Sequence, residues 1–506
     1  MTPSDQLHAL ATRQPAATAL VVTADRVPIS YNGLAGMVDQ LAEKLRRAGL
    51  SPGDRVALRA HSDAGYVVGL LAALATGLVA VPLDPALPAA EQRARVTAAG
   101  ARAVLVAETG GPSEQTLPCW PISVTADGGA ASVDLDVTAA PLPPTAPPEG
   151  LSADDATIMF TGGTTGTPKM VPWTHDSIAG TVSSVVDTYR LGPRDATVAV
   201  MPLFHGHGLI AALLSTLNSG GTVLLPAGGR FSAGTFWDDV GAVGATWFTA
   251  VPTIHRILLA RMAADPPERR RETLRFIRSC SAPLDPKTAQ ELRTEFAAPV
   301  LSAFGMTEAT HQATSMGLDD GAATAGLVGR STGPQIRIID GAGRPCPPGG
   351  VGEVQLRGRT VVRGYLANPE ATAANFTDDW LHTGDLGSLS AAGELTLRGR
   401  IKELINRGGE KISPEHVEDV LAGHPDVAEV AVFGDPDPIY GETVAAVIVP
   451  RPGASPTADQ LSGFCRDRLA AFEVPASFQV VGGLPHTAKG SVDRRAVADS
   501  FGRGPR

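Results

Sequence analysis

The chain has 506 residues, of which 43% are hydrophobic and 19% charged, and its formal net charge is −10. This length predicts several domains, because a single domain usually takes about 100–200 residues. The negative charge excludes a nucleic-acid partner, which needs a basic face, but it allows a local basic pocket for a nucleotide. The four cysteines stand far apart without metal-ligand spacing, which favours the reducing cytoplasm over a disulfide framework.

The N-terminal half alternates short apolar runs with helical segments. Strands are expected at 19–22, 55–58, 79–83, 103–106, 157–160, 197–201, 222–225 and 246–249. This alternation is typical of an α/β core. The apolar run 65–83 is interpreted as a buried helix that Asp63 caps and Gly77 ends, followed by a strand. We therefore expect no membrane partner. The proline-rich stretch 141–148 indicates a surface loop.

The pattern changes towards the C-terminus. Residues 352–357 and 394–397 alternate as antiparallel strands do, whereas Ser413 followed by Pro414 is a typical helix start. Strands are then expected at 427–433 and 444–449, and an amphipathic helix at 458–472. These elements predict an N-terminal domain at 1–400 and a separate C-terminal α+β domain at 401–506.

A loop rich in glycine and threonine follows the apolar strand that ends at Phe160. It reads Thr161, Gly162, Gly163, Thr164, Thr165, Gly166, Thr167, Pro168 and Lys169. Glycines let the backbone approach an anion closely, threonine hydroxyls donate hydrogen bonds, and the lysine adds a point charge. Two residues separate the last glycine from the lysine, so this is not a Walker loop. The loop predicts phosphate binding rather than a flexible polar turn.

This loop resembles the Ser/Thr-Gly-Thr-Thr-Gly-x-Pro-Lys-Gly loop of the superfamily of acyl-CoA ligases and adenylation domains, and the resemblance covers most of the chain. It implies an AMP-forming ligase that activates an acid with ATP and releases pyrophosphate. It also implies an α/β fold whose large N-terminal domain has two α/β/α-type sheets and a small β-barrel-like part, followed by a small mobile α+β domain. Gly162 and Met170 depart from the family, which usually has serine and glycine there.

Two further motifs carry the resemblance around the nucleotide. Phe304-Gly305-Met306-Thr307-Glu308 is similar to the family's aromatic-Gly-x-Thr-Glu motif, in which the first residues border the adenine and the threonine contacts the α-phosphate. By resemblance Glu308 holds Mg²⁺, a cation that takes one or two carboxylates together with phosphate oxygens. The turn at 279–283 resembles the adenine-binding turn, with Ser281, Ala282 and Pro283 against the base.

Two more motifs resemble those that bind the ribose of the nucleotide in the family. Asp385, within Thr383-Gly384-Asp385, is similar to the aspartate that accepts hydrogen bonds from both ribose hydroxyls. In the motif that begins at Gly399, Arg400 would contact ribose or phosphate. Lys402 falls at the family's hinge, about which the small domain rotates between adenylation and thioester formation.

The acid site is expected near a glycine-rich bend at 201–209, where His205 and His207 suggest a polar wall. In the family the first of these histidines gates the acid site. Between Phe204 and Glu308 the chain particularly resembles oxalate–CoA ligases, through 227–232, 251–255 and 307–311. The substrate residues expected from these segments are His205, His207, His255, Thr310 and His311. Their polarity favours a small polar acid over a fatty acid.

The thiol side resembles the family at 404–414, where Arg407, Gly408 and Gly409 would face the pantetheine thiol of CoA. The resemblance assigns catalytic roles to Thr161, Lys169, His205, Thr307, Glu308, Arg400 and Lys402.

The C-terminal lysine motif departs from the family. The usual lysine, which bridges the carboxylate and the α-phosphate, is replaced by Ser491, and Lys489 lies two residues earlier. A cation at that place neutralises developing negative charge, which serine cannot do. Either Lys489 reaches the site on its flexible stem, or adenylation runs without this lysine, or the site is degraded. The other intact motifs disfavour the last alternative.

Three functions follow from this pattern. The first is a cytoplasmic small-acid–CoA ligase of the oxalate type, which uses ATP, Mg²⁺ and CoA. The alternative, favoured by Ser491, is a diazotase-like enzyme that activates nitrite and passes the product to an aryl amine. A non-catalytic nucleotide-binding module is disfavoured, because one catalytic element alone is altered.

Overall fold

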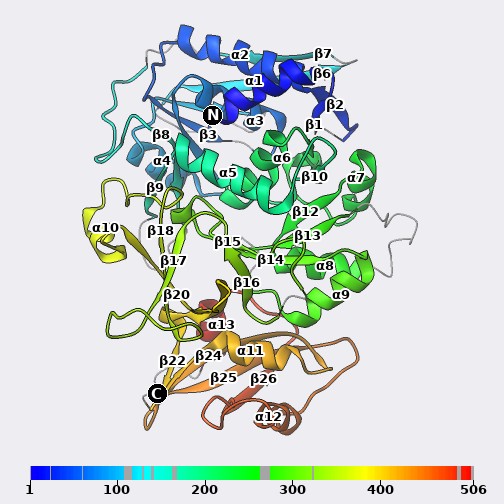
Figure 1. Cartoon of the computed structure of the whole chain (residues 1–506), viewed down its shortest axis with the longest axis vertical. Helices are drawn as coiled ribbons and strands as arrows, with labels where there is room; N and C mark the ends of the chain where they lie inside the picture. The colour runs from blue at the N-terminus through cyan, green and yellow to red at the C-terminus, as the bar shows by residue number, and fades with distance from the viewer. Residues whose placement is uncertain are drawn as a thin grey trace.

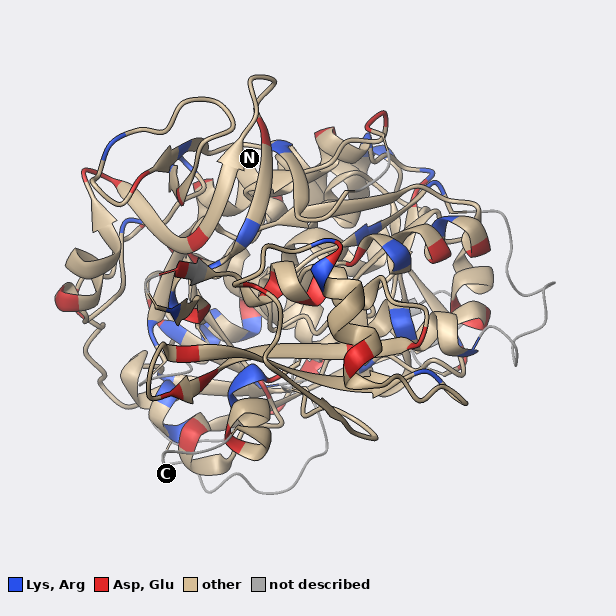
Figure 2. Ribbon diagram, turned by 90° about the horizontal axis from the view of Figure 1, so that it is seen from below, with Lys and Arg blue, Asp and Glu red and all other residues tan. Residues whose placement is uncertain are grey.

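The computed structural model describes residues 2–22, 24–59, 61–107, 117–127, 130–137, 142–161, 168–261, 274–321, 324–408, 410–486 and 492–502. These residues form three β-sheets with helices packed against them (Figure 1). Figure 2, seen from below, shows acidic and basic residues interspersed over this part of the chain, with neither sign gathered in one field.

A seven-stranded sheet forms one end of the molecule, in the order β7-β6-β5-β3-β4-β8-β9. Its strands are β3 (Arg55–Arg59), β4 (Val79–Leu83), β5 (Ala103–Val106), β6 (Cys119–Asp127), β7 (Ala130–Leu135), β8 (Asp155–Phe160) and β9 (Met170–Thr174). The central pairs are parallel, whereas β6 with β7 and β8 with β9 are antiparallel. The β8–β9 pair matters for function because the predicted phosphate loop connects these two strands.

The helix predicted after Asp63 is confirmed as α3 (Ala64–Ala75). The Asp63 carboxylate accepts a hydrogen bond from the Tyr66 backbone N–H at 2.8 Å, and Gly77 adopts a positive φ of 69° just beyond the helix. Eleven of the helix residues are buried, which explains the long apolar run without a membrane. Within the described residues, no helix combines the length and the apolar character that a membrane crossing requires.

A fourteen-stranded sheet fills the middle of the molecule. Its parallel half contains β1 (Thr18–Val22), β11 (Thr222–Leu224), β10 (Ala196–Val198), β12 (Trp247–Ala250), β13 (Phe276–Ser279) and β14 (Val300–Phe304), with β2 (Val27–Ser30) antiparallel at the edge. The antiparallel half contains β15 (Thr314–Ser315), β16 (Leu327–Ser331), β21 (Glu394–Arg400), β20 (Trp380–Leu389), β18 (Val351–Arg357) and β17 (Gln335–Ile339), and β19 (Phe376–Thr377) pairs with β20. The expected β-barrel-like part thus continues the parallel sheet through the β14–β15 pair.

A five-stranded sheet forms the other end, in the order β23-β22-β25-β24, with β26 beside β25. Its elements are β22 (Ile405–Arg407), β23 (Glu410–Ile412), α11 (Pro414–Ala422), β24 (Val427–Asp437), β25 (Gly441–Pro450), α12 (Ala458–Arg466), β26 (Ser477–Val480) and α13 (Arg494–Phe501). The chain passes from the middle sheet to this one through the 3₁₀ turn η5 (Ile401–Glu403). This change of sheet lies next to the predicted boundary at 400, and the division into domains stays a prediction.

The remaining helices are α1 (Pro3–Arg13), α2 (Tyr31–Arg47), α4 (Ala89–Ala98), α5 (His175–Tyr189), the π-helix η1 (His207–Leu214), α6 (Ser215–Asn218), the 3₁₀ turns η2 (Ala227–Gly229) and η4 (Thr307–Ala309), α7 (Phe236–Val243), α8 (Pro252–Arg261), α9 (Pro286–Phe296) and α10 (Pro369–Asn375). A continuous apolar core joins α1, α2 and α3 to η1, through side chains such as Leu41, Leu70 and Leu213. This core fixes η1, which begins at His207.

Three expected elements end earlier than predicted, one of them the strand expected at 222–225, which ends at Leu224. The strand expected at 197–201 ends at Val198, because the Val200 N–H donates back to the Val198 carbonyl and turns the chain. The helix expected at 458–472 ends at Arg466. The apolar pattern continues beyond this end because Leu469, outside the helix, also packs on the core.

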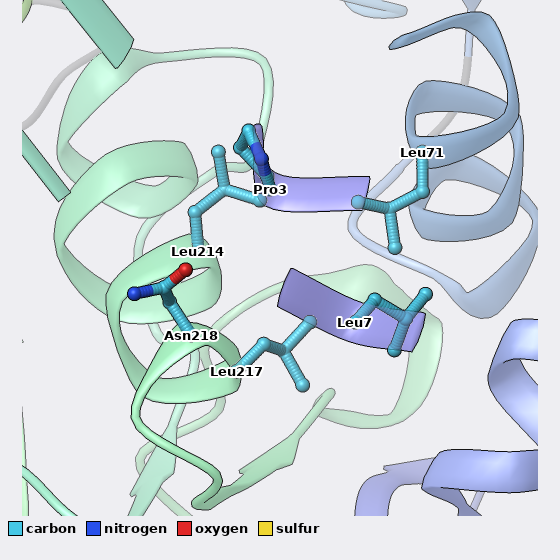
Figure 3. A pocket seen from close by; sticks show the side chains of 6 residues that line it. All are labelled: Pro3, Leu7, Leu71, Leu214, Leu217 and Asn218. Atoms are coloured by element: carbon cyan, nitrogen blue, oxygen red, sulfur yellow. The ribbon is translucent and has the colours of Figure 1, made fainter. Parts of the chain in front are cut away.

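A small apolar pocket lies between the N-terminal helix and η1–α6 (Figure 3). It is lined by Pro3, Leu7, Leu71, Leu214, Leu217 and Asn218. These side chains offer little to a polar acid, so this pocket is not the predicted acid site.

Candidate active site

The predicted phosphate loop connects the antiparallel strands β8 and β9. At its base the Thr161 N–H donates to the Lys169 carbonyl at 3.2 Å, and the Lys169 N–H donates to Thr161 Oγ1 at 3.3 Å. The loop residues Gly162, Gly163, Thr164, Thr165 and Gly166 lie outside the described residues. The hairpin holds both ends of the loop together, and phosphate binding by its interior stays a prediction.

Lys169, Tyr365 and Glu308 lie in a row beside this loop. The Lys169 ammonium lies 4.4 Å from the centre of the Tyr365 ring, and the Tyr365 hydroxyl donates to Glu308 Oε1 at 3.0 Å. Burial and the nearby Glu308 carboxylate raise the pKa of Tyr365, so its phenol keeps the proton that it donates. Tyr365 was missed in the sequence, where nothing in its own segment relates it to a carboxylate 57 positions away.

Glu308 suits a Mg²⁺ ligand. It belongs to η4, directly after β14, and is 7% exposed. Among the described residues it forms no ion pair, and a hard carboxylate oxygen is what Mg²⁺ prefers. The neighbouring Trp173 indole donates to the Thr307 carbonyl at 2.7 Å and so holds this turn in place.

The backbone around the aromatic-Gly-x-Thr-Glu motif is tightly closed. The His311 N–H donates to the Met306 carbonyl at 3.1 Å, and a Cβ added at Gly305 would lie 1.4 Å from the His311 carbonyl oxygen. Position 305 therefore requires glycine. This contact brings His311 beside the segment from Phe304 to Met306 that is predicted to border the adenine.

Asp385 and Arg400 face each other across β20 and β21. Arg400 Nε lies 2.9 Å from Asp385 Oδ1, whereas the other carboxylate oxygen, Oδ2, is buried and has no hydrogen-bond partner among the described residues. A buried acceptor without a donor is costly, and a ribose diol would supply donors. Burial raises the pKa of Asp385 to about 6, although Arg400 opposes this shift. The geometry fits the ribose role expected from the sequence.

Ser281, in the predicted adenine turn, contacts His207. His207 and His205 form the predicted polar wall, which is called the histidine wall below. Ser281 is exposed and has a positive φ of 72°, and its Oγ lies 3.1 Å from His207 Nδ1. Ala282 and Pro283 follow it at the surface, half-buried and exposed respectively. The turn therefore lies where a nucleotide base and the acid pocket can adjoin.

Two of the predicted substrate histidines pack together. The rings of His207 and His311 stack with centroids 5.3 Å apart, and burial, helped by the charge of Arg278, holds both pKa values well below the ordinary range. Both imidazoles are therefore neutral near pH 7. His205 is half-buried, and its ring packs on Phe204 at 4.8 Å.

His255 and Thr310 have different surroundings. His255 is fully buried in α8 beside the Phe248 ring, and burial lowers its pKa to about 3. Thr310 is also fully buried and its hydroxyl donates to the Thr360 carbonyl at 2.7 Å. Both side chains serve the packing behind the wall, and direct contact with the acid stays a prediction for them.

Arg278 was missed in the sequence, although a charged residue inside the apolar strand β13 was a visible signal. Its guanidinium is fully buried and bonds to Thr249, His311 and other polar groups. It thus lies directly behind the histidine wall.

The thiol side is partly described. Arg407 Nη1 donates to the Phe472 carbonyl at 2.7 Å, its guanidinium lies over the Tyr440 ring, and the Gly408 N–H donates to the Tyr440 carbonyl at 2.8 Å. Lys402 lies exposed in η5. Gly409, Lys489 and Ser491 lie outside the described residues, so their expected roles stay predictions.

The three sheets, with a large N-terminal part and a small C-terminal part, define the fold of adenylate-forming ligases. The AMP-binding enzyme model matches residues 7–366, and the model of the AMP-binding enzyme C-terminal domain matches residues 416–491. The chain belongs to the AMP-binding enzyme family.

Relatives and solved structures agree with this assignment. The chain is 42% identical to an oxalate–CoA ligase of Arabidopsis thaliana, over 99% of this chain and 98% of that protein. It is 35% identical to a sulfoacetate–CoA ligase of Cupriavidus necator, over 92% of this chain and 91% of the relative. ATP-bound MatB from Rhodopseudomonas palustris matches with a TM-score of 0.84 at 28% identity, over 99% of both chains.

Proposed function

We propose that the chain activates a small acid of the oxalate type as its AMP adduct, releases pyrophosphate and transfers the acyl group to the thiol of CoA. The observation that carries this proposal is the 42% identity to oxalate–CoA ligase over 99% of the chain. Oxalate, and sulfoacetate in the name of a second relative, are short acids with a second anionic group. The free cysteines support a reducing, cytoplasmic location.

On the ATP side, Asp385 would accept the ribose hydroxyls through its unpartnered Oδ2, while Arg400 holds the other oxygen. Lys169 would attract phosphate oxygens at the end of the β8–β9 loop. Glu308 would hold Mg²⁺, which when bound neutralises phosphate charge. Thr307 and Ser281 would border the same nucleotide.

On the acid side, the neutral histidines His207 and His311 would present a polar wall, and His205 would gate it. On the thiol side, rotation about Lys402 would bring Arg407 and Gly408 towards the acyl adenylate. The names of two relatives, oxalate–CoA ligase and sulfoacetate–CoA ligase, support CoA as acceptor.

The substrate assay tests the proposal directly. The protein is incubated with ATP and Mg²⁺ and with oxalate, other small acids, aryl acids, or nitrite plus an aryl amine, with and without CoA. Pyrophosphate release and mass spectrometry identify the products. We expect acyl-CoA from oxalate. A CoA-independent product from nitrite and amine would replace the CoA-ligase proposal, and no turnover with any acid would exclude enzymatic activation.

The altered lysine motif is tested by Lys489→Ala, with Ser491→Ala as the matched control. If Lys489 substitutes for the usual lysine, its removal lowers the rate of pyrophosphate release about a hundredfold, because one transition-state charge contact is lost. Full-rate adenylation in Lys489→Ala would show that adenylation runs without this lysine.

A further inference from the structure

Arg278 is a fully buried cation behind the histidine wall. It lies on β13 with no exposed surface, and four hydrogen bonds join its guanidinium to neutral groups. These are Tyr189 Oη at 3.0 Å, Thr249 Oγ1 at 2.9 Å, His311 Nε2 at 3.2 Å and Gln312 Oε1 at 2.8 Å. Within the described ranges no carboxylate forms an ion pair with it.

Such an arrangement is unusual for a buried charge. Buried cations are normally paired with carboxylates, because an uncompensated charge in a low-dielectric interior is costly. Neutral acceptors bond to four N–H groups of Arg278 but leave its positive charge uncompensated. An anion that binds nearby would therefore be attracted by this charge with little screening from water.

Two hydrogen-bonded paths lead from Arg278 to the predicted acid site. A guanidinium only donates, so His311 Nε2 accepts from it and the proton of His311 is on Nδ1. Thr249 Oγ1 also accepts from Arg278 and lies 2.6 Å from His207 Nε2, within hydrogen-bond distance. The other ring nitrogen of His207, Nδ1, lies 3.1 Å from Ser281 Oγ. Arg278 therefore fixes the tautomer of His311 directly and is linked to His207 through Thr249.

The other two hydrogen-bonded paths from Arg278 lead away from the histidines, to residues with no predicted role in the site. Tyr189 accepts from Arg278 and lies 2.6 Å from Ser315 Oγ, which donates to the Met316 carbonyl. Gln312 accepts from Arg278 and donates to Thr332 Oγ1 at 3.3 Å. These bonds fix the position of the guanidinium. Cutting one of them is therefore a control for cutting a bond that leads to the histidines.

We propose that Arg278 is a positioning residue that fixes His311 as a hydrogen-bond donor, orients His207 through Thr249 and gives the acid pocket a positive potential, so that it selects a small acid with a second anionic group. The proposal rests on the proposed function, in which these histidines border the acid. An anion presents only acceptors, so donors backed by a buried cation complement it, whereas a group that itself needs acceptors is disfavoured.

The ionisation of the two histidines agrees with this role. Burial and the charge of Arg278 both lower their pKa values, and His205 and His255 act on His207 in the same direction. The other titratable groups that face Arg278 are the buried Tyr189 and Cys280. Removal of the Arg278 charge should therefore raise the pKa of both imidazoles.

The first test is Arg278→Met, with Arg55→Met as the control. Arg55 is also buried, but it lies in the seven-stranded sheet and bonds to backbone carbonyls such as those of Ala99 and Gly100. Oxalate and glyoxylate, which carry two and one carboxylates, are compared by pyrophosphate release. We expect the ratio of kcat/KM for oxalate over glyoxylate to fall roughly tenfold or more in Arg278→Met and to stay constant in Arg55→Met. Ring-labelled histidine NMR should show two imidazole pKa values raised in Arg278→Met alone.

A second pair of variants keeps the cation and cuts one path each. Thr249→Val interrupts the path to His207, whereas Tyr189→Phe interrupts a path that ends at a backbone carbonyl. We expect Thr249→Val to lower the oxalate-to-glyoxylate ratio about threefold to tenfold, and Tyr189→Phe to leave it unchanged while lowering thermal stability. This pair decides the matter even if Arg278→Met fails to fold.

The outcomes separate this proposal from the proposed function. If the wild-type protein turns over oxalate but the ratio is the same in Thr249→Val and Tyr189→Phe, Arg278 has a purely structural role. If the wild-type protein prefers glyoxylate, selection of a second anionic group is wrong while acid activation stands. If it turns over no acid, the proposed function itself fails.

Discussion

Asp385 has one carboxylate oxygen paired with Arg400, and its other oxygen is buried with no partner in the described part of the chain, so this oxygen is free to accept hydrogen bonds from a ligand. Its pKa is raised to about 6. The carboxylate is therefore ionised above about pH 6 and becomes protonated as the pH falls through that value. Protonation removes the charge that strengthens hydrogen bonds from a ribose diol.

We accordingly expect adenosine to bind about tenfold more weakly at pH 5 than at pH 7, with a midpoint near the pKa of Asp385. Adenosine is the suitable probe because its own charge does not change in this range, and calorimetry gives the affinity. Asp385→Asn should bind weakly with no midpoint near pH 6. A wild-type affinity that is constant over this interval would exclude Asp385 as the ribose acceptor.

Tyr365 presents a second residue-scale prediction. Tyr365→Phe keeps the ring under Lys169 and removes only the hydroxyl that donates to Glu308. A hydrogen bond to a charged group contributes about 1.5–3 kcal/mol, so we expect Mg²⁺-dependent binding of a non-hydrolysable ATP analogue to weaken about tenfold.

The control for this experiment is Tyr31→Phe, because the Tyr31 hydroxyl is also buried but donates to the Leu217 and Gly221 carbonyls behind α2. It should lose stability without losing Mg²⁺-dependent affinity. AMP binding without Mg²⁺ should be equal in both variants. An unchanged Mg²⁺ dependence in Tyr365→Phe would show that Tyr365 does not position Glu308 for the metal.

At the scale of elements, the π-helix η1 carries His207 of the predicted acid site. π-helices are rare and occur frequently at functional sites, and this one begins at His207. A Cβ at Gly208 would lie 2.3 Å from the Pro202 carbonyl oxygen and 2.5 Å from that of Met201. The start of η1 therefore lies directly against the bend that carries His205.

Gly208→Ala must displace this start, and we expect it to lower kcat/KM for the acid up to about a hundredfold, as misplacement by roughly 1 Å can do. Gly241→Ala in α7 is the control, since the added Cβ would meet no described atom within 4 Å apart from its own helix backbone and its chain neighbours. It should stabilise the protein by at most about 1 kcal/mol, because alanine favours a helix over glycine. Melting curves distinguish the two effects, and full activity of Gly208→Ala would show that η1 tolerates the shift.

The same scale shows what the sequence could predict. Apolar runs between turn signals located strands such as β4 and β5 with their observed bounds, because burial on both faces leaves a continuous apolar pattern. Asp385 and Arg400, which were each expected on the ribose side of the nucleotide, are neighbours across a strand pair. Arg278 and Tyr365 could not be assigned a role, since their partners come from distant segments. η1 was not distinguished either, because an all-apolar run does not reveal its helical period.

For the whole molecule, ion pairs connect the large N-terminal part to the five-stranded sheet. Arg256 of α8 lies 3.9 Å from Glu429 of β24 and 3.3 Å from Asp285 at the start of α9, while Glu429 also lies 3.5 Å from His486. Arg451 lies 3.8 Å from Glu291. These groups are partly exposed, so each pair contributes at most about 1 kcal/mol and is weakened by salt. Contacts of this size can favour one orientation of a small domain without locking it.

Arg256→Gln should therefore shift the orientation of the C-terminal part by at most about fivefold in population, the equivalent of 1 kcal/mol. Energy transfer between one dye on each part measures the distance distribution. Salt at about 0.5 M, which shortens the reach of charges to a few ångströms, should shift the wild-type distribution and change the variant much less.

Arg344→Gln is the control, because the Arg344–Asp340 pair lies within one turn of the middle sheet. If Arg256→Gln and Arg344→Gln respond to salt as the wild type does, orientation is set by other contacts, such as those between β21 and α11, and the ion pairs are incidental to it.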